Sequence, residues 1–379
     1  MQFSEVLGLE FIKKHLQQST DSRRIPHAQL FVGAEGSGTL PMALAYAQYL
    51  LCKDSIDVES SKLKCAKLCH PDLHFAFPVA TNDTVKKDPI SNLFLSDWRA
   101  FIAQNPYGNL FDWLQFIGIE NKQGFINVDE AEQIVKSLKL KSYEGGFKVM
   151  IIWMAEKMNI SAANKLLKLI EEPPAKTVFI LITENEEQII STIRSRCQVL
   201  HFPLLSENDL VQGLVSRENI SEKEALNIAH QANGNFHKAL NISHNNSNDL
   251  VFEQWFITWV RTAFKAKGDA SVIAQLVEWS ENIAATGRET QKQFLHFCLQ
   301  FFRQALLQNY AVSDLVFIQP QTENFKFDSF SKFIHSNNIL DITQEIYEAI
   351  YHVERNGNPK IIFLDLSIKL TRLIHKKEV

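Results

Sequence analysis

Continuous apolar runs alternate with amphipathic segments along the first part of the chain. Leu30–Val32, Lys148–Ile152 and Val178–Thr183 are mainly apolar and are typical of strands buried on both faces of a parallel sheet. Between them, Val128–Leu140 and Asn159–Glu172 carry apolar residues at helical spacing. Strands that alternate with helices in this way predict an α/β fold with a parallel sheet.

The pattern changes after Leu204, where the strand-like runs stop and apolar positions recur only at helical spacing. The polar stretch Asn241–Asn248 is typical of a linker. The chain is also longer than one compact core usually allows, so two or three domains are expected. We predict an α/β domain over residues 1–203, with an insertion at 81–125. A helical lid domain (204–245) and an all-α C-terminal domain (249–379) follow it.

A glycine-rich turn separates the first predicted strand from the helix that begins near Met42. It contains Gly33, Gly36 and Gly38. A strand, a glycine-rich turn and a helix in this order form the scaffold of a phosphate-binding P-loop, whose pattern is G-x-x-x-x-G-K-[ST]. The first and last of these glycines have the spacing of the pattern's outer glycines. The three glycines and Thr39 are therefore the candidate nucleotide-binding residues.

The residues that carry P-loop chemistry are replaced. Thr39 stands where a lysine reaches the β- and γ-phosphates, and Leu40 stands where a hydroxyl binds Mg²⁺. Pro41 removes a backbone N–H from the first helical turn. At the end of the strand Lys148–Ile152, Trp153 and Met154 occupy the positions of the acidic residues of an ATPase. The sequence predicts a nucleotide-binding fold that no longer works as an ATPase and binds ATP weakly or not at all.

Three cysteines and two histidines lie close together in the sequence and suggest a zinc site. Zinc takes four nitrogen or sulfur ligands in a tetrahedral array. Cys52, Cys65 and Cys69 are the candidate ligands, and His70 or His74 would have to supply the fourth. The three-residue separation of the last two cysteines departs from the usual C-x₂-C spacing. The alternative is that these cysteines are reduced thiols without a metal.

Charge and hydropathy give no sign of a nucleic-acid-binding or membrane protein. Lys and Arg number 39 against 43 Asp and Glu, so the net charge is −4 rather than strongly positive. No apolar run approaches the roughly 20 residues that span a bilayer. The first residues lack the basic and apolar regions of a signal peptide. We therefore expect a cytoplasmic protein with no membrane partner and with reduced cysteines.

The order of these motifs resembles the AAA+ clamp-loader family of bacterial replication. After the P-loop turn and the strand Lys148–Ile152 come the helix Asn164–Pro174, the strand that ends at Thr183, and the motif Ser195–Cys197. The resemblance covers nearly the whole chain, and 81–125 is the poorest match. It implies an AAA+ P-loop domain with a parallel sheet, a small helical lid, and an all-α C-terminal collar through which loader subunits assemble.

The resemblance also implies roles for individual residues. Arg196 matches the arginine finger, which contacts the γ-phosphate of ATP held by a neighbouring subunit. His237 falls where active relatives carry a lid arginine that touches nucleotide. The family's zinc module uses four cysteines, whereas only three occur here. Three lysines could contact the phosphates of DNA, although a solvated helix face is the more common explanation for any one of them: Lys136, Lys139 and Lys141.

The sequence thus favours a non-catalytic clamp-loader subunit that lends Arg196 in trans to a neighbouring ATPase. The implied partners are the ATPase motor and delta subunits of the loader, the sliding clamp through the complex, and primed DNA as a secondary contact. One alternative is an active motor subunit, which would need a lysine at position 39 and a carboxylate at 153 or 154. The other is an AAA+ scaffold protein outside replication.

Overall fold

The computed structural model describes residues 1–119, 122–143, 145–244, 248–312, 315–316, 320, 322 and 325–377. The chain divides into two compact units. The first comprises Met1–Ile119 and Gln123–His244, and the second comprises Glu120–Lys122 and Asn245–Val379. Helices that the sequence assigns to a separate lid are part of the first unit. None of the helices in the described ranges is long and apolar enough to cross a membrane.

The first unit contains a five-stranded sheet in the order β2-β3-β4-β1-β5, and every neighbouring pair is parallel. Its strands are β1 (Ala28–Val32), β2 (Leu73–Ala76), β3 (Lys148–Ile152), β4 (Thr177–Thr183) and β5 (Gln198–His201). The three inner strands β1, β3 and β4 are buried along their whole length, which explains their continuous apolar runs. The predicted α/β fold with a parallel sheet is confirmed.

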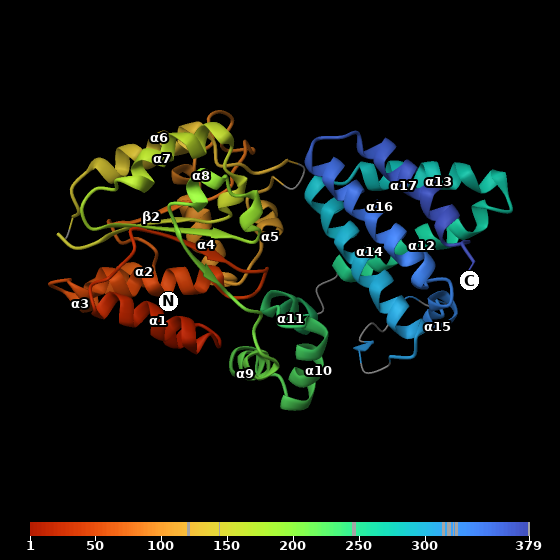
Figure 1. The fold of residues 1–379 in the computed structure, drawn as a ribbon, viewed down its shortest axis with the longest axis horizontal. Coiled ribbons are helices and arrows are strands. Elements are labelled where there is room, and N and C mark those ends of the chain that lie inside the picture. Colours follow the sequence, from red (N-terminus) through yellow and green to blue (C-terminus); the bar gives the residue numbers. More distant parts are fainter. Residues whose placement is uncertain are drawn as a thin grey trace. The chain divides into compact units, whose positions relative to one another are not determined.

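Helices cover both faces of this sheet (Figure 1). One face packs on α1 (Glu10–Asp21) and α2 (Thr39–Lys53), with α3 (Val58–Ala66) beside α2. The other face packs on α6 (Val128–Lys139) and α7 (Ile160–Glu171). Successive strand residues point to opposite faces, so that Phe31 joins the first core and Leu30 the second. The short helix α8 (Ser191–Arg194) precedes β5.

The predicted insertion contributes two helices, α4 (Leu95–Gln104) and α5 (Leu110–Phe116), to the described part of the first unit. Both carry buried tryptophans that pack on the core. The rings of Trp98 and Trp113 meet edge to face with centroids 5.1 Å apart, and Phe77 stacks on Trp98 at 4.3 Å. Trp153 joins the same cluster, with its centroid 5.1 Å from that of Trp98. The insertion is therefore built into the hydrophobic core.

Three helices complete the first unit: α9 (Glu207–Glu218), α10 (Glu222–Ala232) and α11 (Phe236–Ser243), here called the lid. Each begins at a side chain that accepts a hydrogen bond from the backbone of its first turn, namely Ser206, Ser221 and Asn235. The predicted linker Asn241–Asn248 begins too early, because α11 continues to Ser243. Residues 245–247 of that linker lie outside the described residues.

The described part of the second unit is helical and forms its own core. Its helices are α12 (Asn248–Ala266), α13 (Ile273–Ala284), α14 (Arg288–Asn309), α15 (Phe327–Ser331), α16 (Ser336–Glu354) and α17 (Pro359–Leu373). Trp259 and Trp279 stack with centroids 5.1 Å apart, and the Trp259 indole donates a hydrogen bond to Ser367 Oγ at 2.8 Å. Short 3-10 helices in the two units are Phe3–Glu5, Ser91–Phe94, Ala155–Lys157, Glu186–Gln188 and Ala270–Val272.

Candidate functional site

The glycine-rich turn joins the end of β1 to the start of α2, as the sequence predicts. Gly33 N–H donates to the carbonyl of Thr183 at 3.1 Å, which ties the turn to the neighbouring strand β4. Gly36 and Gly38 have φ angles of +71° and +91°, in the left-handed region that favours glycine. Gly38 precedes the first residue of α2, which is Thr39. The four candidate nucleotide-binding residues therefore lie together where the turn meets α2.

The residues that the sequence places at the P-loop and acidic positions of an ATPase belong to the protein core. Leu40, Trp153 and Met154 are each at most 4% exposed. They line a cavity of about 30 Å³ together with the turn itself, with Pro106–Gly108 of the insertion and with Glu184. That volume holds about two water molecules, whereas small-molecule pockets are typically about 300–1,000 Å³. The space beside the turn is filled by the chain's own side chains.

The lid packs directly on the glycine-rich turn. The N–H of Phe236, the first residue of α11, donates to the carbonyl of Gly36 at 3.2 Å. A Cβ atom on Gly36 would lie 1.9 Å from Oδ1 of Asn235, so only glycine allows this approach. Asn235 in turn begins α11 by accepting a hydrogen bond from Lys238 N–H at 2.9 Å. The start of the last lid helix and the turn are thus one packed structure.

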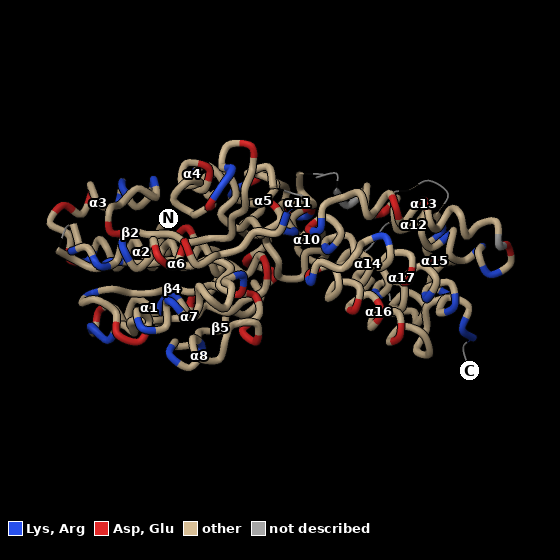
Figure 2. The backbone as a smooth tube through the Cα atoms, turned by 90° about the horizontal axis from the view of Figure 1, so that it is seen from above, with Lys and Arg blue, Asp and Glu red and all other residues tan. Residues whose placement is uncertain are grey.

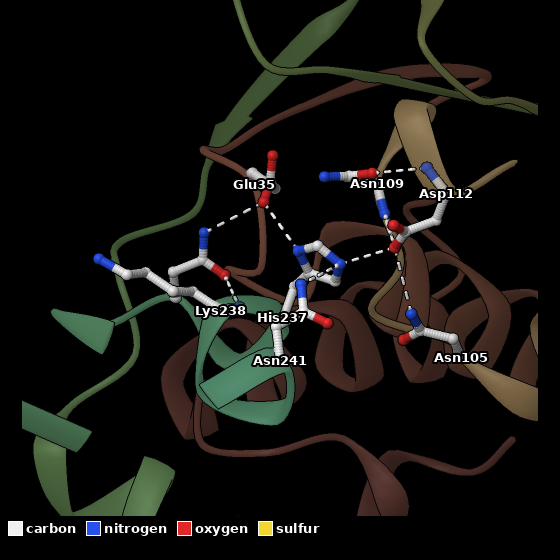
Figure 3. Close-up of polar contacts among 8 residues, drawn as sticks. Glu35, Asn105, Asn109, Asp112, His237, Lys238 and Asn241 are labelled. Atoms are coloured by element: carbon white, nitrogen blue, oxygen red, sulfur yellow. Dashed lines mark hydrogen bonds and ion pairs between the residues drawn. The ribbon is translucent and has the colours of Figure 1, made fainter. Parts of the chain in front are cut away.

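A buried histidine connects three separate segments at this point (Figure 3). His237 Nδ1 lies 2.8 Å from Oε1 of Glu35 in the turn, and its Nε2 lies 2.6 Å from Oδ2 of Asp112 on α5. Burial alone would lower the pKa of His237, but hydrogen bonds to Asp112 and Glu35 and their charges outweigh it and raise the pKa to about 10. At neutral pH the imidazole is therefore a cation between two carboxylates.

Glu35 supplies a negative charge beside this cation. Burial opposes its charge, but the hydrogen bond to His237 and the charge of the imidazolium keep the pKa of Glu35 below its ordinary value. The sequence marks His237 as a candidate site residue, but it marks neither Glu35 nor Asp112. Asp112 carries one local signal, a capping box with Asn109 at the start of α5, and that signal predicts a helix start rather than a site.

Two further polar residues lie at the carboxyl edge of the sheet. Thr183, the last residue of β4, is fully buried, and its Oγ1 donates to the carbonyl of Asn185 at 3.0 Å. Glu156 follows β3 and accepts a hydrogen bond from Glu184 N–H at 3.2 Å. Burial raises the pKa of Glu156 above its ordinary value. Ligands of open parallel sheets bind at this edge, and the cavity described above lies there.

Arg196 lies outside that cavity. It follows α8, and its Nη1 donates to the carbonyl of Thr192 at 2.9 Å. Its Nε lies 3.2 Å from Oε2 of Glu171, and the side chain is 34% exposed. Burial raises the pKa of the neighbouring Cys197 thiol to about 11, so this cysteine is not a reactive thiolate at neutral pH. Arg196 is thus accessible but held by its own chain.

The three candidate zinc ligands differ in their surroundings. Cys65 is buried, Cys52 is half-buried and Cys69 is exposed. In the described part of the chain, no three His, Cys, Asp or Glu side chains are grouped closely enough to hold a metal ion. The buried His70 accepts a hydrogen bond from Asp72 N–H through Nδ1 at 3.1 Å, and burial lowers the pKa of His74. Zinc at these positions stays a prediction.

The lysines considered for DNA contact lie at the end of α6 and just beyond it. Lys136, Lys139 and Lys141 are all exposed. Figure 2 shows basic and acidic positions interspersed along the first unit rather than separated into faces of one sign. This mixture agrees with the net charge of −4. Contact between these lysines and DNA stays a prediction.

The proteins to which this chain is similar in sequence are subunits of DNA polymerase III. A family model described as "DNA polymerase III, delta subunit" matches residues 8–206. The DNA polymerase III subunit delta' of Bacillus subtilis is 29% identical over 238 residues, which cover 62% of this chain and 59% of that protein. The DNA polymerase III subunit tau of the same species is 23% identical over 390 residues, covering 99% and 62%. The Escherichia coli delta' subunit is 35% identical over 107 residues, covering 28% and 32%.

Two solved structures from Thermotoga maritima align with most of the chain. A DNA polymerase III gamma subunit-related protein is 14% identical, with 97% of this chain and 99% of that one covered and a TM-score of 0.37. The RuvB Holliday junction branch migration motor is 13% identical, with 86% and 88% covered and a TM-score of 0.40. The chain spans about three fifths of the length of the two Bacillus subtilis relatives. Because the family model matches more than half of its residues, this chain belongs to the DNA polymerase III delta' subunit family.

Proposed function

We propose that this chain is a non-catalytic subunit of the DNA polymerase III clamp loader. The observation that carries the proposal is the filled space beside the glycine-rich turn. Leu40, Trp153 and Met154 stand where an ATPase holds magnesium and polarises water, and all three are buried in the core. With Thr39 in place of the lysine, the turn has no side-chain cation for the phosphates. A motor subunit would need these groups.

The chain's contribution to ATP hydrolysis is then made in trans, through Arg196. A guanidinium is planar and permanently charged, which suits it to stabilise the charge that spreads over a transferring phosphoryl group. The position of Arg196 supports this role because it is partly exposed and does not line its own chain's cavity. The ligand of this residue would be the γ-phosphate of ATP bound by an adjacent motor subunit.

The partners follow from the family and from the relatives' names. The subunits named tau, gamma and delta' among the relatives are all described as subunits of DNA polymerase III. We expect this chain to assemble with motor and delta subunits of the loader through the helical second unit. It would help the complex to open the sliding clamp and to place it on primed DNA.

The test is ATP turnover by the purified chain and by a loader reconstituted with and without it. We expect the chain alone to hydrolyse no ATP above the background of a mock purification. Addition of the chain to motor and delta subunits should raise DNA-stimulated hydrolysis and clamp loading. Turnover by the isolated chain, or a loader that works equally well without it, would refute the proposal.

A further inference from the structure

The loop between α4 and α5 covers the glycine-rich turn. Pro106, Tyr107 and Gly108 line the small cavity at the turn. Tyr107 is 3% exposed, and its Oη accepts a hydrogen bond from Leu7 N–H at 3.0 Å. A Cβ atom on Gly38 would lie 3.4 Å from the Tyr107 ring, in ordinary van der Waals contact. The tyrosine ring therefore lies beside the residue that precedes α2, where a P-loop would present its backbone donors to phosphate.

The same tyrosine joins this loop to the lid. Its ring meets Phe236 of α11 edge to face, with centroids 4.9 Å apart. The guanidinium of Arg217 on α9 lies over both rings, 5.4 Å from the Tyr107 centroid and 5.6 Å from the Phe236 centroid. Arg217 also donates a hydrogen bond to the carbonyl of Glu5. One continuous stack thus connects the N-terminal segment, the insertion and the lid.

A few residues further on, the insertion reaches the lid a second time through Asp112. The Asp112–His237–Glu35 cluster places one charged side chain on the insertion, one on the lid and one on the turn (Figure 3). Asn105 and Asn109 hold Asp112 in place: Asn105 Nδ2 lies 3.3 Å from Oδ2, and Asn109 accepts from Asp112 N–H at 2.9 Å. Removal of one charge would leave the others without full compensation in a site where His237 is buried and the two carboxylates are only 26–30% exposed.

We propose that residues 105–112 are a built-in plug of the nucleotide cleft, and that the Asp112–His237–Glu35 cluster latches the lid over it. A lid that responds to nucleotide must separate from the turn to admit the ligand. Here hydrogen bonds, ion pairs and aromatic contacts all cross that boundary. The first unit therefore keeps one closed conformation whether or not ATP is present. The plug and the latch do not depend on a role in a clamp loader, so an experiment that refutes that role would not refute them.

Amide hydrogen exchange of the full chain tests the latch, because exchange rates report local opening. We expect His237→Gln and Asp112→Asn to accelerate exchange in α11 by more than about tenfold and to leave β1 and β4 unchanged. The matched control is His230→Gln, which removes another lid imidazole, one that lies 3.3 Å from Glu207 but is 46% exposed. Unchanged exchange in α11 for a folded Asp112→Asn variant would overturn the latch.

Two measurements test the plug without disturbing that cluster. Exchange in the lid of the unaltered chain should be the same with and without saturating Mg-ATP. The variant Thr39→Lys restores the missing lysine but leaves Tyr107 in the cleft, and it should still fail to bind a fluorescent ATP analogue. ATP-dependent protection of the lid, or micromolar binding by Thr39→Lys, would show that the cleft is open and would overturn the proposal.

Discussion

Arg196 Nε lies 3.2 Å from Oε2 of Glu171, at the end of helix α7. The two side chains are 34% and 54% exposed, so solvent screens their attraction. Exposed ion pairs contribute about 0–1 kcal/mol. A second contact, from Arg196 Nη1 to the carbonyl of Thr192, fixes the other end of the guanidinium. Glu171 therefore restrains the proposed arginine finger against its own subunit only weakly.

Glu171→Gln should release this restraint while keeping the shape of the side chain. Because the ion pair is weak, we expect DNA-stimulated ATP hydrolysis by the reconstituted loader to stay the same or rise, by at most about fivefold. The matched control is Glu172→Gln at the next position, which should have no effect. A large fall in hydrolysis with Glu171→Gln would show instead that the carboxylate is needed to position Arg196.

Arg196→Ala should abolish the contribution in trans without affecting assembly. Arginine fingers increase the rate of the phosphoryl-transfer step by about 10³–10⁵-fold. We expect the hydrolysis that depends on this subunit to be lost, while gel filtration still shows the intact complex. Arg196→Lys should restore little, because an ammonium lacks the planar fork. The control is Arg194→Ala, an exposed arginine two residues earlier. Unchanged hydrolysis with Arg196→Ala would remove this residue from its role.

The sequence predicted the features that depend on local patterns, namely the buried strands and the glycine-rich turn. The apolar runs became the buried strands β1, β3 and β4, and the glycine spacing became a turn with positive φ at Gly36 and Gly38. It could not predict that Trp153 joins the tryptophans of the insertion, because ring packing depends on three-dimensional contacts. The Glu35–His237 contact spans 202 residues, and the capping box at Asp112 marks only the start of a helix. Such long-range pairs leave no periodic signal.

Gly36→Ala should loosen the lid more than backbone strain alone would. The left-handed conformation at φ +71° costs a non-glycine residue about 1–2 kcal/mol. The added Cβ would also lie 1.9 Å from Asn235 Oδ1. Gly118→Ala is the matched control, because its φ is +68° and no atom lies within 4 Å of the added Cβ. In urea unfolding, we expect Gly36→Ala to lose clearly more stability than the control. Equal losses would contradict close packing of the lid on the turn.

Zinc content decides between the two interpretations of the cysteines. Because Cys65 and Cys69 depart from the usual C-x₂-C spacing, and one is buried while the other is exposed, we expect elemental analysis of chain purified without chelator to find less than about a tenth of an equivalent. Cys69→Ser, at an exposed position, should then leave the thermal midpoint unchanged. Cys65→Ser should lower it, because that thiol is buried. About one equivalent of zinc, lost together with stability in Cys69→Ser, would establish a metal site.

The stability that His237 confers should depend on pH in a defined direction. Its pKa is about 10 in the folded chain, against an ordinary value of 6.5. A raised pKa means that folding favours the protonated form. The contribution is therefore complete below about pH 6.5 and is lost as pH rises toward 10, by up to about 1.4 kcal/mol per pH unit.

The difference in unfolding free energy between the native chain and His237→Gln isolates this contribution, because other titrating groups largely cancel. We expect the difference to be largest near pH 6 and to shrink steadily toward pH 9.5 in urea titrations of both chains. Glu35 acts in the opposite direction and only in acid, since its pKa is lowered and its contribution falls away as pH drops below its ordinary range. A difference that stays constant from pH 6 to 9.5 would mean that His237 is neutral between its two carboxylates, and the latch would then rest on packing rather than on charge.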